Sequence, residues 1–82
     1  MATVLRFLSY RVVIYSNDHR PSHVHVMNDE HEAIFDLNCP VGPPRLRENY
    51  GFRSAPLRRI ASHLQAKLTA LCKQWRRIHG YD

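Results

Sequence analysis

Hydrophobic residues form short runs along the first half of this chain, and in residues 23–37 they alternate with polar residues on two neighbouring runs, which is the pattern of half-buried β-strands. The runs are rich in β-branched, aromatic and aliphatic residues and are bounded by short polar segments. Four runs are predicted to be strands: residues 4–8, 11–16, 23–27 and 30–37.

Asn28 and Asp29 separate the last two runs, and both residue types tolerate the left-handed conformation that a two-residue hairpin turn requires. Such a turn would place Met27 opposite Glu30 and His25 opposite Glu32. Because side chains alternate between faces, this register predicts one apolar and one polar face. The apolar face would hold Val24, Val26, Ala33, Phe35 and Leu37, and the polar face His23, His25, Glu32 and Asp36.

From Ser54 onward the apolar positions recur in steps of three and four, which indicates an amphipathic α-helix. Ser54 is a candidate N-cap, Pro56 suits a first turn, and Gly80 offers a stop. A single helix over this range would be long for so small a domain, so the element is either continuous or broken into two helices near residues 67–69. The apolar stripe, interpreted as core, comprises Leu57, Ile60, Ala61, Leu64, Leu68, Leu71, Trp75 and Ile78.

Pro40, Pro43 and Pro44, together with Gly42, interrupt any regular element, so residues 38–53 are predicted to be irregular. The predicted fold over residues 1–82 is therefore one α+β domain. It would consist of a small antiparallel sheet of three to four strands, packed by a long C-terminal helix that is either continuous or broken in two.

With 82 residues, the chain has room for a single modest core. Cys39 and Cys72 lack a CxxC spacing and are interpreted as reduced, buried thiols of a cytoplasmic protein. We find no basic-then-apolar leader and no apolar run of membrane-spanning length, so no membrane association is predicted.

Positive charge is concentrated in the C-terminal half. Residues 1–37 carry three basic and five acidic side chains, which gives a net charge of −2. Residues 38–82 carry nine basic and two acidic side chains, which gives a net charge of +7. This asymmetry favours contact with a polyanion or an acidic partner, the alternative being a solvated basic surface. The arginines predicted to bind nucleic acid or a partner protein are Arg20, Arg45, Arg47, Arg53, Arg58 and Arg59. Tyr50 and Phe52, which lie between arginines, would either stack on bases or anchor a loop to the core.

Three of the six histidines, His19, His23 and His25, lie within seven residues. Imidazole titrates near neutral pH, serves as an acid or base, and ligates transition metals. Together with Asp18 and Glu32, these histidines are the candidate catalytic residues. Because neither His23 nor His25 is predicted to fill the core, replacing either one is expected to leave stability largely intact.

Three functions remain open for this cluster. As an acid–base site it would cleave RNA without a metal, one imidazole taking the 2′-hydroxyl proton and another protonating the leaving oxygen, with an arginine stabilising the charged phosphorane. As a metal site it would use the three imidazoles and Asp18 or Glu32. Alternatively, Asp18 and His19 cap the loop and the strand histidines form an ordinary polar face. The metal-free version is favoured, without a cofactor, because His-x3-His-x-His matches no well-specified ligand frame.

A wider pattern surrounds the histidines and comprises Thr3, Arg6, Phe7, Tyr15, Asp18, His19, Pro21, His23, His25, Ala33 and Asp36. This pattern resembles that of a small bacterial family, domain of unknown function 4160, and the resemblance covers nearly the whole chain. This chain has Ser22 where the family usually has a second proline, and His63 and Lys67 where members more often have Trp and His.

The resemblance implies the toxin-like half of a bacterial two-gene toxin–antitoxin module, which would act on RNA or translation. Its partner would be the antitoxin encoded by the adjacent gene, and RNA would be its target, with the chain a candidate ribonuclease. The alternatives are a non-catalytic module that binds a protein or nucleic acid through the basic half, and a metal-binding protein with histidine ligands.

Overall fold

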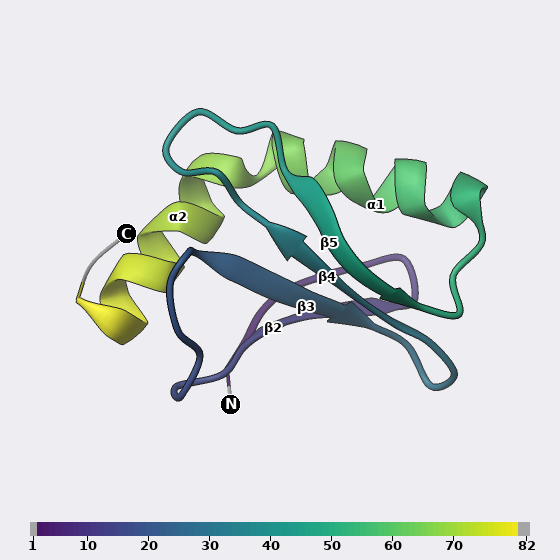
Figure 1. The fold of residues 1–82 in the computed structure, drawn as a ribbon, viewed down its shortest axis with the longest axis horizontal. Helices are drawn as coiled ribbons and strands as arrows, with labels where there is room; N and C mark the ends of the chain where they lie inside the picture. Colours follow the sequence, from purple (N-terminus) through teal and green to yellow (C-terminus); the bar gives the residue numbers. More distant parts are fainter. Residues whose placement is uncertain (1, 81–82) are drawn as a thin grey trace.

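A computed structural model describes residues 2–80. Its strands form one antiparallel sheet in chain order (Figure 1). The predicted α+β class is confirmed, but the sheet has five strands where three to four were predicted, and two helices follow it. The elements are β1 (Ala2–Phe7), β2 (Tyr10–Ile14), β3 (His23–Met27), β4 (Glu32–Asp36), β5 (Arg45–Tyr50), α1 (Ser54–Ala66) and α2 (Leu68–His79).

The additional strand, β5, lies within residues 38–53, so the prediction that this segment is irregular was wrong for residues 45–50 and correct for residues 38–44 and 51–53. All six residues of β5 are exposed, because the strand forms the edge of the sheet. An exposed edge strand needs no alternation of apolar and polar residues, and charged side chains on it discourage pairing with another chain. The pattern in the sequence therefore carried no signal for this strand.

The hairpin between β3 and β4 has a longer loop than predicted. Its backbone closes through a hydrogen bond from Asn28 N–H to the His31 carbonyl, and the Asn28 side chain accepts bonds from the N–H groups of Glu30 and His31. Met27 consequently pairs with Glu32 and not with Glu30. A shift of two residues leaves every side chain on its predicted face.

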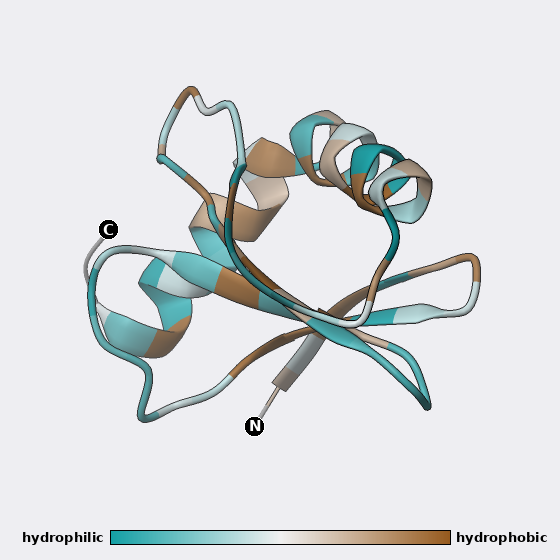
Figure 2. Ribbon diagram, turned by 45° about the vertical axis from the view of Figure 1, so that its right-hand side comes forward, coloured by the Kyte–Doolittle hydropathy of each residue, from teal (hydrophilic) through white to brown (hydrophobic). Residues whose placement is uncertain are grey.

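The apolar face of this hairpin lies in the core, as predicted. Val24, Val26, Ala33 and Leu37 are completely buried, and Phe35 almost so. They form one hydrophobic cluster with residues of β2 and of both helices. Figure 2 shows α1 above the sheet and α2 running down past its left-hand end, with hydrophobic segments on both helices and on the strands. Trp75 of α2, fully buried, belongs to the same cluster.

The helical region divides in two at Lys67, within the interval in which the sequence allowed a break. Arg53, rather than Ser54, occupies the N-cap of α1 and makes no side-chain capping bond. Gly80 ends α2 in the left-handed conformation, at φ 79°, as its position predicted. Among the described residues, neither helix combines the length and the apolar character needed to cross a membrane.

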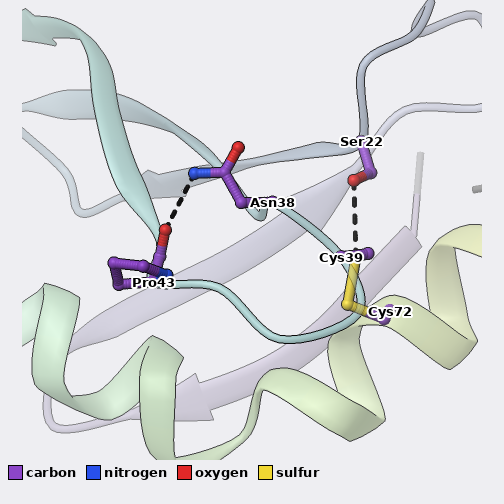
Figure 3. Close-up of a disulfide and its surroundings, with 5 residues drawn as sticks. All are labelled: Ser22, Asn38, Cys39, Pro43 and Cys72. Atoms are coloured by element: carbon purple, nitrogen blue, oxygen red, sulfur yellow. Dashed lines mark hydrogen bonds between the residues drawn. A yellow bond between two sulfur atoms is a disulfide. The ribbon is translucent and has the colours of Figure 1, made fainter.

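Cys39 and Cys72 form a disulfide, which overturns their interpretation as reduced thiols (Figure 3). The bond joins the segment that follows β4 to the middle of α2. The Ser22 hydroxyl lies 3.4 Å from Cys39 Sγ, so this covalent link adjoins the segment that enters β3. Spacing along the sequence gave no hint of the pair, because 33 residues separate the two cysteines.

We expect reduction of this disulfide to lower the free energy of unfolding by about 4 kcal/mol, because the cross-link restricts a long loop of the unfolded chain. Urea denaturation with and without reductant measures the change. The Cys39→Ser/Cys72→Ser double variant should match the reduced protein and no longer respond to reductant. Equal stability of oxidised and reduced wild-type protein would contradict the expectation.

Candidate functional site

The centre of the candidate site is the polar face of β3. His23 and His25 are two residues apart on this strand, so both side chains leave the sheet on the face opposite Val24 and Val26. The predicted polar face is thereby confirmed. His23 pairs directly with Asp36, while Glu32 lies diagonally from His25 and not opposite it.

Asp18 reaches this face from the loop between β2 and β3. The loop folds back tightly: Asp18 N–H donates to the Tyr15 carbonyl at 3.1 Å, and Tyr15 N–H donates to Asp18 Oδ2 at 3.0 Å. The same carboxylate oxygen lies 3.4 Å from Nε2 of His23 and 3.4 Å from Nε2 of His25. Three side chains thus converge on one point, and we call them the Asp18–His23–His25 centre.

The other nitrogen of each imidazole is held by a hydrogen-bond acceptor. His23 Nδ1 lies 2.8 Å from the Pro21 carbonyl oxygen, and His25 Nδ1 lies 2.9 Å from Glu32 Oε2. A carbonyl and a carboxylate can only accept, so each Nδ1 carries the proton. In its neutral form each ring then directs an unprotonated Nε2 toward Asp18.

This arrangement sets the chemistry of the centre. Two imidazole lone pairs and a carboxylate oxygen face one another, which is unfavourable unless a cation lies among them. A proton shared by the group would give an acid–base centre. A metal ion would satisfy all three atoms at once, and these three residues are the group of potential metal ligands found among residues 2–80.

Aromatic rings shield the centre from solvent. The Tyr15 ring meets His25 edge-on with centroids 4.7 Å apart, and the Trp75 ring lies 5.2 Å from that of His23. His79 stacks in turn on Trp75, with centroids 3.9 Å apart. The side chains of Asp18, His23 and His25 are only 13%, 7% and 13% exposed. The centre is therefore sheltered from solvent.

The other two predicted catalytic residues, His19 and Glu32, do not belong to the Asp18–His23–His25 centre itself. His19 is exposed and does not join the centre. Glu32 contacts the centre indirectly, through Nδ1 of His25. His63, which stands where family members more often have Trp, stacks on Phe7 of β1, with ring centroids 4.4 Å apart.

The predicted binding arginines are exposed, but they lie on several elements. Arg47 forms an ion pair with Asp36, and Arg45 is the residue paired with Asp36 on β5. Arg20 lies on the loop that leads into β3, Arg53 occupies the N-cap position of α1, and Arg58 and Arg59 lie on α1.

The two aromatic residues between arginines have different positions. Phe52 is buried and contacts the rings of Tyr10 and His31, which makes it a loop anchor. Tyr50 is 58% exposed on β5. Its hydroxyl bonds to Glu48, and this bond, together with the charge of Glu48, raises the pKa of Tyr50.

The sequence pattern did not reveal the ring contacts of Tyr15, Trp75 and His79. Trp75 was interpreted only as part of the core stripe, although its ring also touches a site histidine. The four-residue spacing of Trp75 and His79, which places both on one side of a helix, was the available signal. No pattern could have linked α2 to β3 across the fold.

A family model described as "Domain of unknown function (DUF4160)" matches residues 9–76. The chain belongs to this family. The match includes the whole Asp18–His23–His25 centre, Glu32 and Trp75, so the resemblance found in the motif is confirmed. No curated protein and no solved structure matches this DUF4160 chain.

The burial of His23, which is 5% exposed, contradicts the expectation that it could be removed without a loss of stability. We expect His23→Ala to lower the free energy of unfolding by about 1–3 kcal/mol, because the ring packs on Trp75 and bonds to Pro21. His19→Ala, the exposed control, should change it by less than about 0.5 kcal/mol. Chemical denaturation of both variants provides the comparison, and equal effects would argue against the packing of His23.

Proposed function

We propose that this DUF4160 protein is the toxin-like component of a bacterial toxin–antitoxin module and acts on RNA or translation. The Asp18–His23–His25 centre would perform the chemistry, and nearby arginines would hold the phosphates. The partner would be the antitoxin encoded by the adjacent gene. The two-gene context comes from the resemblance of the chain to this bacterial family.

The observation that carries the proposal is a row of residues across three strands. His23 pairs with Asp36, and Asp36 pairs with Arg45, so all three share one face of the sheet. Neighbouring strands lie ~4.8 Å apart, which puts the backbone of Arg45 about 10 Å from that of His23. The long side chain of Arg45 can span much of this distance toward a phosphate at the centre.

Arg47 adds charge at the same place because the pairing of β4 with β5 is irregular. Phe35 faces Leu46 while Ile34 faces Glu48, so Arg47 is an extra residue on β5. Bulges of this kind redirect a side chain, and Arg47 forms an ion pair with Asp36. The net charge of +7 in residues 38–82 favours the approach of a polyanion.

A hollow beside the centre offers room for part of a nucleotide. Its lining includes Arg20, Pro21 and Ser22 from the loop that enters β3, and Asn38 and Cys39 from the segment after β4. The Pro21 carbonyl is the group that orients the His23 ring. A phosphate bound by Arg20 would therefore lie next to Pro21, the residue whose carbonyl holds the His23 ring of the Asp18–His23–His25 centre.

The first test is growth. Expression of the chain alone should inhibit bacterial growth, and co-expression of the adjacent gene should relieve the inhibition. His25→Ala should abolish the effect while His19→Ala retains it, since His19 lies outside the centre. Normal growth at verified high levels of folded protein would refute the toxin role and leave the binding module.

The second test separates the arginines at the centre from the general basic surface. Arg45→Ala/Arg47→Ala should weaken RNA binding and reduce the slope of log K against log salt by about 1 for each phosphate that the variant no longer binds. The matched control, Arg58→Ala/Arg59→Ala, removes the same charge from α1, whose first turns lie at the other end of the sheet from the start of β3 (Figure 1). Equal losses in the two variants would indicate an unspecific basic surface.

The alternative is a non-catalytic module that binds a partner protein or nucleic acid. The exposure of Arg53, Arg58 and Arg59 around the start of α1 favours it. Under this alternative, His25→Ala keeps both partner binding and any effect on growth, whereas Arg58→Ala/Arg59→Ala weakens them. The same set of variants therefore distinguishes the two functions.

A further inference from the structure

We infer that Asp18, His23 and His25 are the protein ligands of a divalent first-row transition-metal ion, with Zn²⁺ as its simplest occupant. This inference goes beyond the proposed function and does not depend on it, because metal binding is measured without RNA or a partner. The sequence favoured a metal-free centre.

The spacing of the three ligand atoms suits a metal ion. Asp18 Oδ2 lies 3.4 Å from each of the two Nε2 atoms, and all three atoms lie within 4.8 Å of one another. In a tetrahedral zinc site with bonds of about 2.0–2.1 Å, neighbouring ligand atoms are ~3.3 Å apart. The two separations from Asp18 Oδ2 therefore match those of a zinc site, and the third is within reach of one ion.

The orientation of the two imidazole rings also matches that of metal ligands. Metal-bound histidines usually donate their remaining N–H to a carboxylate or a backbone carbonyl, which fixes the tautomer and increases the basicity of the ligand. Both forms occur here: His25 donates to Glu32, and His23 donates to the Pro21 carbonyl. The two Nε2 lone pairs are consequently fixed in the direction of Asp18.

A buried polar atom at the centre needs a partner. His25 Nε2 is buried and makes no hydrogen bond to any group of residues 2–80. Its near neighbour is the carboxylate oxygen of Asp18, which also bears lone pairs. Leaving such an atom unsatisfied is costly, and a cation between the ring and the carboxylate removes the cost.

The ligand set indicates which class of metal the site would take. Two imidazoles and one carboxylate suit zinc and iron, whereas Mg²⁺ and Ca²⁺ prefer sites composed of oxygen ligands. Three protein ligands with a position left for water or substrate are typical of catalytic rather than structural zinc sites. Such an ion would supply a Lewis acid at the centre.

The motif concealed this set because the third ligand is not the third histidine. His19 is exposed, and its place is taken by the preceding residue, Asp18, after the loop turns back on Tyr15. The frame is therefore Asp-x4-His-x-His. It depends on a folded loop, and the spacing of histidines alone does not reveal it.

The test uses the purified full chain in non-reducing buffer, so that Cys39 and Cys72 remain paired and offer no thiolates. After treatment with a chelator, the protein is titrated with Zn²⁺ by calorimetry and with Co²⁺ by visible absorption. We expect one ion per chain, cobalt bands of low coordination number, and a rise in melting temperature with bound Zn²⁺.

Variants assign the ligands. Asp18→Ala and His25→Ala should weaken Zn²⁺ binding by more than about 100-fold. Glu32→Ala should weaken it by about 10- to 100-fold, because the His25 ring loses the hydrogen bond that orients it. His19→Ala and Glu30→Ala are the matched controls and should bind as wild type. Circular dichroism shows whether each variant is folded; where one is not, His25→Gln replaces His25→Ala and Asp18→Asn replaces Asp18→Ala.

The inference is overturned if the chain takes up no stoichiometric metal, since the three groups then share a proton. It is also overturned if Asp18→Ala and His25→Ala bind as wild type, or if His19→Ala loses the metal. Growth inhibition by a chain that binds no metal would refute this inference and leave the proposed function standing. Stoichiometric binding by a chain without effect on growth would do the reverse.

Discussion

The alternation of side chains along β3 is the constraint on which the rest of this protein depends. Val24 and Val26 on one face are completely buried in the core, while His23 and His25 on the other face converge on Asp18. One short strand thus contributes both to the hydrophobic cluster and to the Asp18–His23–His25 centre. A shift of this strand by one residue would place imidazoles in the core and destroy both.

Trp75 connects the two faces of this arrangement. Its ring is part of the core cluster, and it also lies against His23 and stacks on His79. Helix α2, which carries it, is held by the disulfide to the segment after β4, and Cys39 of that bond lies near Ser22 at the entrance to β3 (Figure 3). The histidine rings are therefore supported by packing and by a covalent link, which is the rigidity that a preorganised centre requires.

Hydrogen bonds from neighbouring segments also hold the three side chains of the centre in place. Pro21 and Glu32 fix the two rings from behind, and the backbone of Tyr15 fixes the Asp18 carboxylate. These partners come from the loop before β3 and from β4, so the hairpin and the loop have to be correct before the centre exists. The exposed arginines of β5 depend only on the pairing of the edge strand with β4, so their placement requires less of the fold than the placement of the centre does.

Local pattern alone determined the α+β class, the position of four strands, the two faces of the central hairpin and the interval in which the helix breaks. These features depend on periodicity, and the faces survived an error of two residues in register because the period of a strand is two. The motif likewise placed the chain in its family. Tertiary structure decided three features that periodicity does not encode. They are the strand β5, which has no buried face, the pairing of Cys39 with Cys72, and the presence of Asp18 rather than His19 at the centre. Each of these features depends on contacts between segments that lie apart in the sequence. The loop after β2 folds back, β5 pairs at the edge of the sheet, and α2 packs against the segment after β4. The distances among Asp18, His23 and His25 arise from a loop that folds back on itself, so the chemistry of this protein becomes visible only in the folded chain.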